Sequence, residues 1–307
     1  MMSSTLFTAP PDWRWLIVSY FFIGGLAGGC FFLAALIDLV GRPEDRPLAR
    51  LGYYIALPGV VLSGLLLTVD LGRPERFWHM MIESNTYRPM FKYWSPMSIG
   101  AWALLVFGLF SFLSFLGAVA EDDHLRWPVL RRIRERWPAF RKLGPASGLG
   151  RTIAAVGAVF GIYIAGYTGV LLAVTNRPIW SDTPLISMLF VVSAASTSAA
   201  LMIVMAHRSG WSMPGLADLH RMDAWVIALE LFVLIAVMVS LGPVLRAWLN
   251  AWGVLLLIAV VLGMIAPLVL VWRARRFPQL NVVTAPVLVL LGGFLLRVVI
   301  IFSSEAI

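Results

Sequence analysis

The chain of 307 residues is 60% hydrophobic and only 13% charged, and its mean hydropathy is +0.86. Soluble domains are about half apolar and roughly a quarter charged, so this composition excludes a soluble globular protein. The net charge of +8 would suggest a nucleic-acid partner in a soluble chain. In a membrane protein basic residues mark cytoplasmic loops instead, and we expect no nucleic-acid binding.

Eight apolar segments follow one another along the chain, each long enough to cross a bilayer as a helix. Their approximate ranges are 13–38, 48–70, 94–119, 151–175, 184–207, 222–243, 251–272 and 282–302. Backbone groups in lipid must pair within their own segment, which helices of this length achieve. We therefore predict an all-α polytopic protein, with one integral membrane domain over 1–307 and eight transmembrane helices in two four-helix bundles. The first segment is too long for a signal peptide and is interpreted as a retained helix.

The distribution of Lys and Arg predicts the orientation. Sixteen of the 24 basic residues lie in the loops after predicted helices 1, 3, 5 and 7, and seven lie on the other side. The positive-inside rule then places both termini outside, in the periplasm, if the membrane is the bacterial cytoplasmic (inner) membrane. The basic segment 120–150 is expected to be a cytoplasmic loop lying on anionic lipid.

The segment 70–79 breaks this charge rule. It follows predicted helix 2 and contains Asp70, Arg73, Arg76 and His79, and its loop holds four of the seven outer basic residues. This local excess on the basic-poor side suggests that the charges have a function. The alternative is that they pair with the acidic residues of the same loop.

Ionisable residues inside transmembrane segments are costly, so each is a candidate for a functional role. Glu230 lies within predicted helix 6 and Arg297 within predicted helix 8. We expect both to face the interior of the bundle. A structural ion pair and a proton path both remain open for these two residues.

Three polar groups from three helices are predicted to share one depth near the outer side. They are Tyr20 in helix 1, Asp70 at the end of helix 2 and Tyr167 in helix 4, and Arg73 follows close by. A phenol in an apolar, aromatic-walled cleft can hydrogen-bond a carbonyl of a small planar ligand. A quinone has that shape and lives in the bilayer. The alternative for each tyrosine is anchoring at the membrane interface.

The sequence argues against haem and metal in this chain. The four histidines are His79, His124, His207 and His220, and none lies in the middle of a predicted helix. A membrane cytochrome b needs axial ligands, commonly histidine pairs within helices. The single cysteine cannot make a zinc site or an iron–sulfur cluster. Phosphate-loop and nucleophile-elbow motifs are also absent from the sequence.

Several short motifs together resemble the NrfD-type membrane subunits, the family that includes the polysulfide reductase membrane subunit. Asp70-Leu-Gly-Arg-Pro-x-Arg-Phe ends helix 2, and Ser95-Pro-Met-Ser-Ile-Gly-Ala-Trp opens helix 3. Trp13-x-Trp15 precedes a glycine-rich first helix. Tyr167-Thr-Gly-Val-Leu-Leu is followed by Asn176-Arg-Pro-x-Trp180. The resemblance covers nearly the whole chain and is strongest over the first four helices.

The resemblance implies a haem-free quinone or quinol subunit that uses menaquinone or ubiquinone and is not catalytic alone. Its partners would be an iron–sulfur subunit docked on the outer face and a catalytic, molybdopterin-type subunit. Tyr167 matches the family's quinone-contacting tyrosine. Tyr20 stands where the polysulfide reductase subunit has a histidine, and Ile17 where it has a polar amide.

The site predicted from residues and resemblance together has three parts. Tyr167 and Asp70 carry the chemistry, and Trp15, Ile17, Tyr20 and Arg73 complete the quinone pocket. Residues expected to dock the partner are Arg76, His79, Arg88 and Arg177.

Two other classes of function remain open. Buried charges and prolines within helices would suit a secondary transporter, although we find no convincing inverted repeat with paired broken helices. A purely structural membrane anchor that has lost its quinone site is the second alternative.

Overall fold

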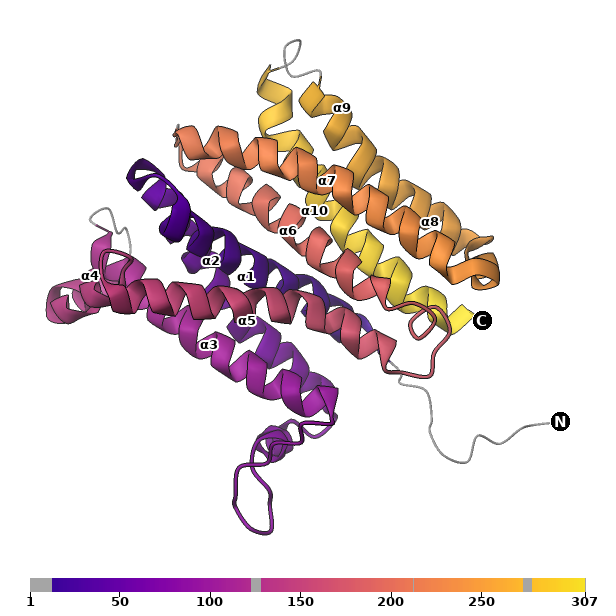
Figure 1. Ribbon diagram of the computed structural model, residues 1–307, viewed down its shortest axis with the longest axis horizontal. Helices are drawn as coiled ribbons and strands as arrows, with labels where there is room; N and C mark the ends of the chain where they lie inside the picture. Colours follow the sequence, from indigo (N-terminus) through magenta and orange to yellow (C-terminus); the bar gives the residue numbers. More distant parts are fainter. Residues whose placement is uncertain (1–12, 123–127, 212, 273–277, 307) are drawn as a thin grey trace.

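The computed structural model describes residues 13–122, 128–211, 213–272 and 278–306. Within these ranges eight helices are long and apolar enough to cross a membrane, which confirms the predicted all-α class and helix number. Figure 1 shows them as a layer of long, roughly aligned rods. The helices are α1 (Trp15–Val40), α2 (Arg46–Asp70), α3 (Pro96–Glu121), α5 (Gly148–Ala173), α6 (Leu185–Arg208), α7 (Pro214–Leu241), α8 with α9 (Ala251–Val260, Ala266–Trp272) and α10 (Pro278–Phe302).

Two regions differ from the ranges expected from hydropathy. Helix α7 begins at Pro214, eight residues before the expected 222, because its first turns are polar and lie beyond the apolar stretch. Gly215 N–H in that first turn donates to the buried Asp45 carboxylate at 2.7 Å, which anchors the extension to the α1–α2 connection. The segment 120–150, expected as a loop, contains the short helix α4 (Pro128–Arg136) and the 3₁₀ turn η3 (Pro138–Leu143).

The seventh spanning segment is one continuous rod with an irregular middle. A π-helical turn, η5 (Val261–Ile265), joins α8 to α9. Within it, Gly263 lies against Gly292 of α10 so closely that a Cβ on Gly263 would come within 2.5 Å of the Gly292 Cα. The extra residue of a π turn lets the helix keep this contact while changing its direction.

Helix α1 is the centre of the packing. It contacts α2, α5, α6 and α10. Helix α3 contacts both α2 and α5. On the other side of α1, α6 contacts α7, α7 contacts α9, α9 contacts α10, and α10 contacts α6. In Figure 1, α6 lies between α1, α2, α3 and α5 on one side and α7 to α10 on the other. The predicted membrane orientation of these helices stays a prediction.

Glycines make these close approaches possible. A Cβ on Gly161 of α5 would lie 2.7 Å from the Gly28 carbonyl oxygen of α1, and one on Gly29 would lie 2.8 Å from the Ala194 carbonyl oxygen of α6. Lipid tails are as apolar as the helices, so membrane helices associate largely through such close packing. The glycine pairs of the first helix therefore serve packing.

A network of charges ties α1, α2 and α3 at the end opposite Tyr20 and Tyr167. Arg46 pairs with Asp38 and, at 2.7 Å, with Glu121, and the Tyr53 hydroxyl donates to Asp38 at 2.8 Å. Arg50 lies 3.6 Å from Asp122. These side chains are mostly buried, and mutual pairing offsets the cost of removing each charge from water.

Replacing Gly28 by Val tests the α1–α5 contact. The new side chain would overlap the Gly161 backbone and force the helices apart, so we expect a loss of about 1–3 kcal/mol of stability. Thermal unfolding of the purified protein in detergent measures the change. Gly108→Val in α3 is the matched control because nothing lies within 4 Å of a Cβ there, and an equal loss in both variants would contradict this assignment.

Candidate functional site

Tyr167 lies in the C-terminal half of α5 and is held by the start of α3. Its hydroxyl donates to the Pro96 carbonyl oxygen at 2.8 Å, and its side chain is 5% exposed. Gly100, one turn further along α3, lies directly under the phenol ring, and a Cβ there would overlap the ring and its hydroxyl. Pro96 begins the helix and the Ser95 hydroxyl caps it. The local sequence therefore determines where α3 starts, and with it the position of the Pro96 carbonyl that Tyr167 contacts.

A groove of about 250 Å³ runs along the other side of Tyr167, between α5 and α6. The rings of Tyr163 and Tyr167 stack along it, with centroids 5.7 Å apart and planes 23° apart. Tyr163 is 38% exposed, so the groove opens at the surface that faces lipid in a membrane. The lining residues are Ile162, Tyr163, Gly166, Tyr167, Val170, Ser187, Met188 and Val191.

Small residues create this groove. Gly169 of α5 lies against the Ser187 backbone of α6, and a Cβ on Gly166 would lie 2.8 Å from a methyl of Val191. The helices therefore touch through backbone beside the two tyrosines, of which Tyr167 is buried and Tyr163 is partly exposed. The result is an apolar slot whose lining includes Tyr163 and Tyr167.

Two of the predicted pocket residues pack in the same core as Tyr167. Tyr20 is 1% exposed and Ile17 is 5% exposed, and both belong to the apolar cluster that contains Tyr167. The structure thus brings these residues of α1 and α5 into one continuous interior. The groove itself is lined by α5 and α6 alone.

Trp15 lies in a different environment. Its side chain is 59% exposed and packs against Phe302 at the end of α10, with ring centroids 4.8 Å apart. Trp13 instead stacks on Trp180 at 5.2 Å, inside the core. The two tryptophans therefore face different parts of the fold, and Trp13 is the one that packs in the same core as Tyr20 and Tyr167.

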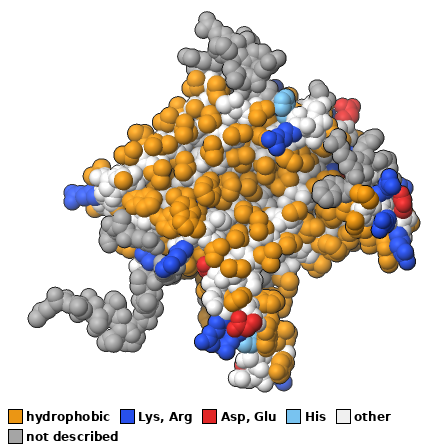
Figure 2. All heavy atoms as spheres, turned by 180° about the vertical axis from the view of Figure 1, so that it is seen from behind, with side chains coloured by type: hydrophobic (Ala, Val, Ile, Leu, Met, Phe, Trp, Pro, Cys, Tyr) orange, Lys and Arg blue, Asp and Glu red, His pale blue; other side chains and the backbone are white. Residues whose placement is uncertain are grey.

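The segment after Asp70 forms a lobe that protrudes beyond the helices (Figure 1). Asp70, Arg73 and Arg76 are exposed at its base, where Gly72 has a positive φ of 67° and the 3₁₀ turn η2 (Pro74–Met80) begins. Figure 2 shows charged side chains gathered on this lobe, next to a largely apolar body. Asp70 therefore lies at the boundary between the helices and the lobe.

Local contacts hold the lobe in place. His79 packs edge-on against Trp78, with centroids 3.9 Å apart. The Trp102 indole N–H of α3 donates to the Met90 carbonyl oxygen at 3.0 Å. Arg88 is exposed, and its carbonyl oxygen accepts a bond from Glu83 N–H at 2.9 Å. These bonds fix the predicted docking residues of the lobe on an ordered backbone.

Arg177 lies on the α5–α6 connection. Its guanidinium lies 5.6 Å from the ring of Trp180, whose indole N–H donates to the Ile300 carbonyl oxygen of α10 at 2.7 Å. Trp180 is completely buried and thus serves as an anchor between the two parts of the fold at this end.

Glu230 and Arg297 lie in the interior, as expected, at 2% and 1% exposure. Arg297 Nη1 donates to the Ser193 hydroxyl at 3.1 Å and to the Gly293 carbonyl oxygen at 2.8 Å. Ser193 also lies beside the Glu230 carboxylate, so one hydroxyl of α6 stands between the two charges. Glu230 Oε1 and Arg297 Nε have no hydrogen-bond partner among the described residues.

No group of three or more His, Cys, Asp or Glu residues that could hold a metal ion occurs within the described ranges. The expectation that the chain holds neither haem nor metal stays a prediction.

Three further residues lie beside these sites but are not among the site residues predicted from the sequence. Tyr163 precedes Tyr167 by four residues, a spacing that places both on one helix face and could have identified it. Asp223 precedes Glu230 by seven residues, again on one face, and it accepts a bond from Ser196 at 3.0 Å. Nothing in the local sequence of Ser187 points to the groove.

Gly100→Ala tests the contact between Tyr167 and the start of α3. The added methyl would displace the phenol from Pro96, so we expect a loss of about 1–3 kcal/mol of stability. Thermal unfolding in detergent measures this loss. Gly108→Ala in the same helix is the control, since open space surrounds that position, and equal behaviour of the two variants would contradict the contact.

Comparison with known proteins identifies the family. The chain is 29% identical to protein NrfD of Escherichia coli strain K12, over 95% of each chain. It is 28% identical to a polysulfide reductase chain of Wolinella succinogenes, over 95% of this chain and 94% of the relative. It is 26% identical to a selenate reductase subunit of Mesobacillus selenatarsenatis, over 36% of this chain and 24% of the relative. The family model described as "Polysulphide reductase, NrfD" matches residues 7–307, and this chain, an integral membrane protein, belongs to the NrfD family.

Proposed function

We propose that this chain is the membrane subunit of a respiratory oxidoreductase complex and exchanges electrons between the quinone pool and an iron–sulfur subunit on the outer face. Two relatives bear the names of reductase subunits, one of a polysulfide reductase and one of a selenate reductase. The observation that carries the proposal is the groove lined by Tyr163 and Tyr167, whose rings stack, with Tyr163 partly exposed at the surface of the helices.

The groove suits the head of a lipid-soluble quinone. Its volume of about 250 Å³ lies just below the usual range of enclosed small-molecule pockets, about 300–1,000 Å³. A groove of this volume suits the ring of a quinone whose tail remains in the surrounding lipid. The lining is almost entirely apolar, apart from the tyrosine hydroxyls and Ser187, so polar recognition falls to those few groups.

The hydrogen bond from Tyr167 to Pro96 determines whether its hydroxyl can still donate or accept a hydrogen bond. A phenol has one donor and two acceptor lone pairs, and the proton of Tyr167 is already donated to Pro96. Tyr167 therefore accepts a hydrogen bond, as from a quinol hydroxyl, and holds the substrate by that atom. Tyr163, which is partly exposed, supplies a donor suited to a quinone carbonyl.

The remaining predicted pocket residues form the border of this region. Tyr20 and Ile17 make the dry wall behind Tyr167, and Trp15 lies at the outer end of the same helix. Quinol supplies two electrons and two protons when oxidised. We assign Asp70, with Arg73 beside it, to the release of protons at the outer boundary, and the same residues serve the reverse direction.

The outer lobe and the α5–α6 connection are the proposed docking surface for the iron–sulfur subunit. Arg76, His79 and Arg88 lie on the lobe and Arg177 on the connection. A catalytic, molybdopterin-type subunit would join through that partner. Basic side chains suit a partner with an acidic surface, and charge complementarity steers such encounters.

Glu230 and Arg297 are proposed as a proton path within the helices. A buried carboxylate with a free oxygen, a serine hydroxyl and a guanidinium form a series of groups that can pass a proton with the help of water. Asp223, two turns away on α7 and bonded to Ser196, extends the polar track about 10 Å toward the other side of the membrane.

Tyr167→Phe removes the accepting oxygen from the groove. We expect quinol oxidation by the purified complex to fall about tenfold or more, since each 1.4 kcal/mol lost from the transition state is a factor of ten. The assay follows oxidation of a soluble quinol analogue, with the amount of co-purified partner measured in parallel.

Tyr54→Phe is the matched control, because that tyrosine donates to Asp122 at the opposite end of the helices. Undiminished turnover in Tyr167→Phe would remove Tyr167 from the mechanism. A complex that assembles but never binds quinone in the unaltered form would favour a structural anchor. A lone protein that moves a solute would favour a transporter.

Glu230→Gln keeps the shape of the side chain and removes its charge. If Glu230 carries protons, vesicles containing the complex should move fewer protons per electron, while electron transfer with the proton gradient collapsed stays close to the unaltered rate. Proton uptake by a pH-sensitive dye measures this ratio. Glu135→Gln on the exposed surface of α4 is the control, and an unchanged ratio in Glu230→Gln would leave Glu230 a structural role.

A further inference from the structure

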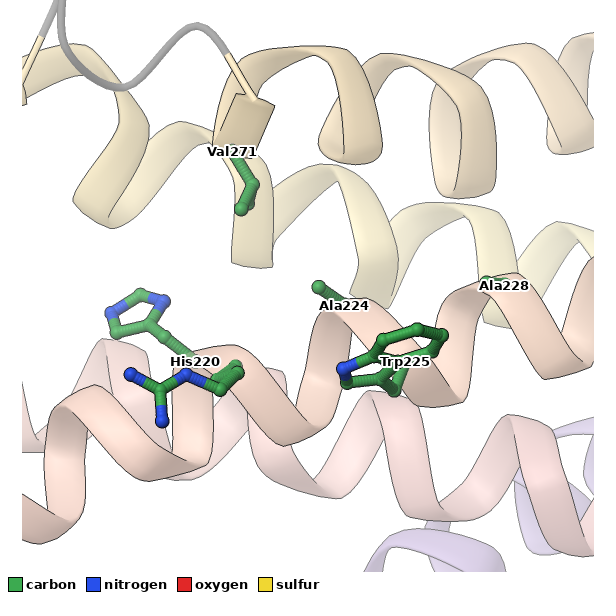
Figure 3. Close-up of a pocket in the computed structure, with 6 residues that line it drawn as sticks. His220, Ala224, Trp225, Ala228 and Val271 are labelled. Atoms are coloured by element: carbon green, nitrogen blue, oxygen red, sulfur yellow. The ribbon is translucent and has the colours of Figure 1, made fainter.

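A second, larger groove lies between α7 and α9, away from Tyr167. Its volume is about 470 Å³, and Figure 3 shows its lining on the two helices. Apolar side chains make most of its wall, with His220 and Arg221 at one end. The lining residues are His220, Arg221, Ala224, Trp225, Ala228 and Val271.

Packing elsewhere explains why no side chain of the described residues fills this groove. At the π turn η5, Gly263 brings the seventh spanning segment into backbone contact with Gly292 of α10, while η5 and α9 also contact α7. On α7, Ala224 and Ala228 are four residues apart and present only methyl groups on the same face. A slot therefore remains between two helices that a membrane would surround with acyl chains.

The slot has a polar end and an apolar end. From His220 to Ala228 the groove follows about 12 Å of α7. Val271 faces it from α9, and Trp225 projects along α7 with 75% of its surface exposed (Figure 3). This arrangement matches the shape of a lipid, whose charged head lies at the membrane boundary and whose acyl tail runs inward.

Positive charge marks the polar end. Arg221 is 77% exposed and lies 3.8 Å from Asp218, which in turn lies 4.0 Å from Arg42. The single carboxylate of Asp218 thus lies near two arginines. It can neutralise only one of their charges, so positive charge is in excess at the mouth of the groove.

We propose that the α7–α9 groove binds one anionic phospholipid of the leaflet that faces the basic loops. Its phosphate pairs with Arg221 and accepts a hydrogen bond from the His220 imidazole, and an acyl chain lies along Ala224, Ala228 and Val271. Basic pockets between transmembrane helices on this side are suited to anionic headgroups. The site does not depend on the quinone proposal, since it shares no residue with the groove beside Tyr167.

The test measures lipid retained by the full-length protein in its complex. The complex is purified with and without added phosphatidylglycerol or phosphatidylcholine, and bound phospholipid is counted by native mass spectrometry. We expect the unaltered protein to retain phosphatidylglycerol in preference to phosphatidylcholine. Arg221→Gln should weaken that retention about fivefold, the effect of removing one basic residue's contact with an anionic lipid surface. Ala228→Trp should fill the groove and abolish retention of either lipid.

Two control variants separate the site from general effects. Arg132→Gln removes an exposed charge from α4, and Val159→Trp adds bulk to a lipid-facing position of α5 that is 67% exposed. Both should retain phosphatidylglycerol as the unaltered protein does. Equal retention in all variants, or equal retention of both lipids by the unaltered protein, would overturn the proposal. Loss of a protein partner in Ala228→Trp with lipid retention unchanged would also overturn it and assign the groove to that partner.

Discussion

The close approach of α1 to its neighbours is the constraint on which the rest of the structure depends. Gly28 meets Gly161 of α5 and Gly29 meets the Ala194 backbone of α6, so three helix backbones come together where side chains would hold them apart. In lipid, the hydrophobic effect does not press helices together, and such contacts supply much of the cohesion. Once α1 is fixed between α5 and α6, the ends of all three helices near Tyr20 and Tyr167 are fixed relative to one another.

The candidate site follows from that arrangement. Tyr167 is held by Pro96 and Gly100 of α3, while the contact of Gly169 with Ser187 sets the width of the slot on the α6 side. The tyrosine thus donates its hydroxyl proton to the Pro96 carbonyl oxygen, and the residue lines the groove. A phenol held in this way has a defined orientation before any substrate arrives, which lowers the entropy cost of binding.

Polar groups inside the helices are arranged around α6. Ser193 stands between Arg297 and Glu230, and Ser196 bonds Asp223, so the serines of one helix solvate charges from two others. Arg297 also lies over the rings of Phe22 and Phe190, at 5.5 and 5.2 Å, which offsets part of the cost of burying its charge. These charged residues would be costly to expose to lipid, and they are stabilised by partners from other helices that the folded chain brings next to them.

The sequence by itself determined the class of protein, the number of spanning helices and the candidates for chemistry. Length and apolarity suffice for the helices, because each must satisfy its backbone alone, and ionisable residues such as Glu230 are conspicuous where charge is costly. Which side chains meet was decided by tertiary structure. The position of a residue along a helix predicts its depth but not the neighbour it faces. The packing of Trp15 on Phe302 and the stacking of Tyr163 on Tyr167 are therefore seen only in the folded chain. The grooves beside Tyr167 and beside Arg221 each lie between two consecutive spanning helices, and their width depends on how closely those helices pack, which no local sequence pattern predicts.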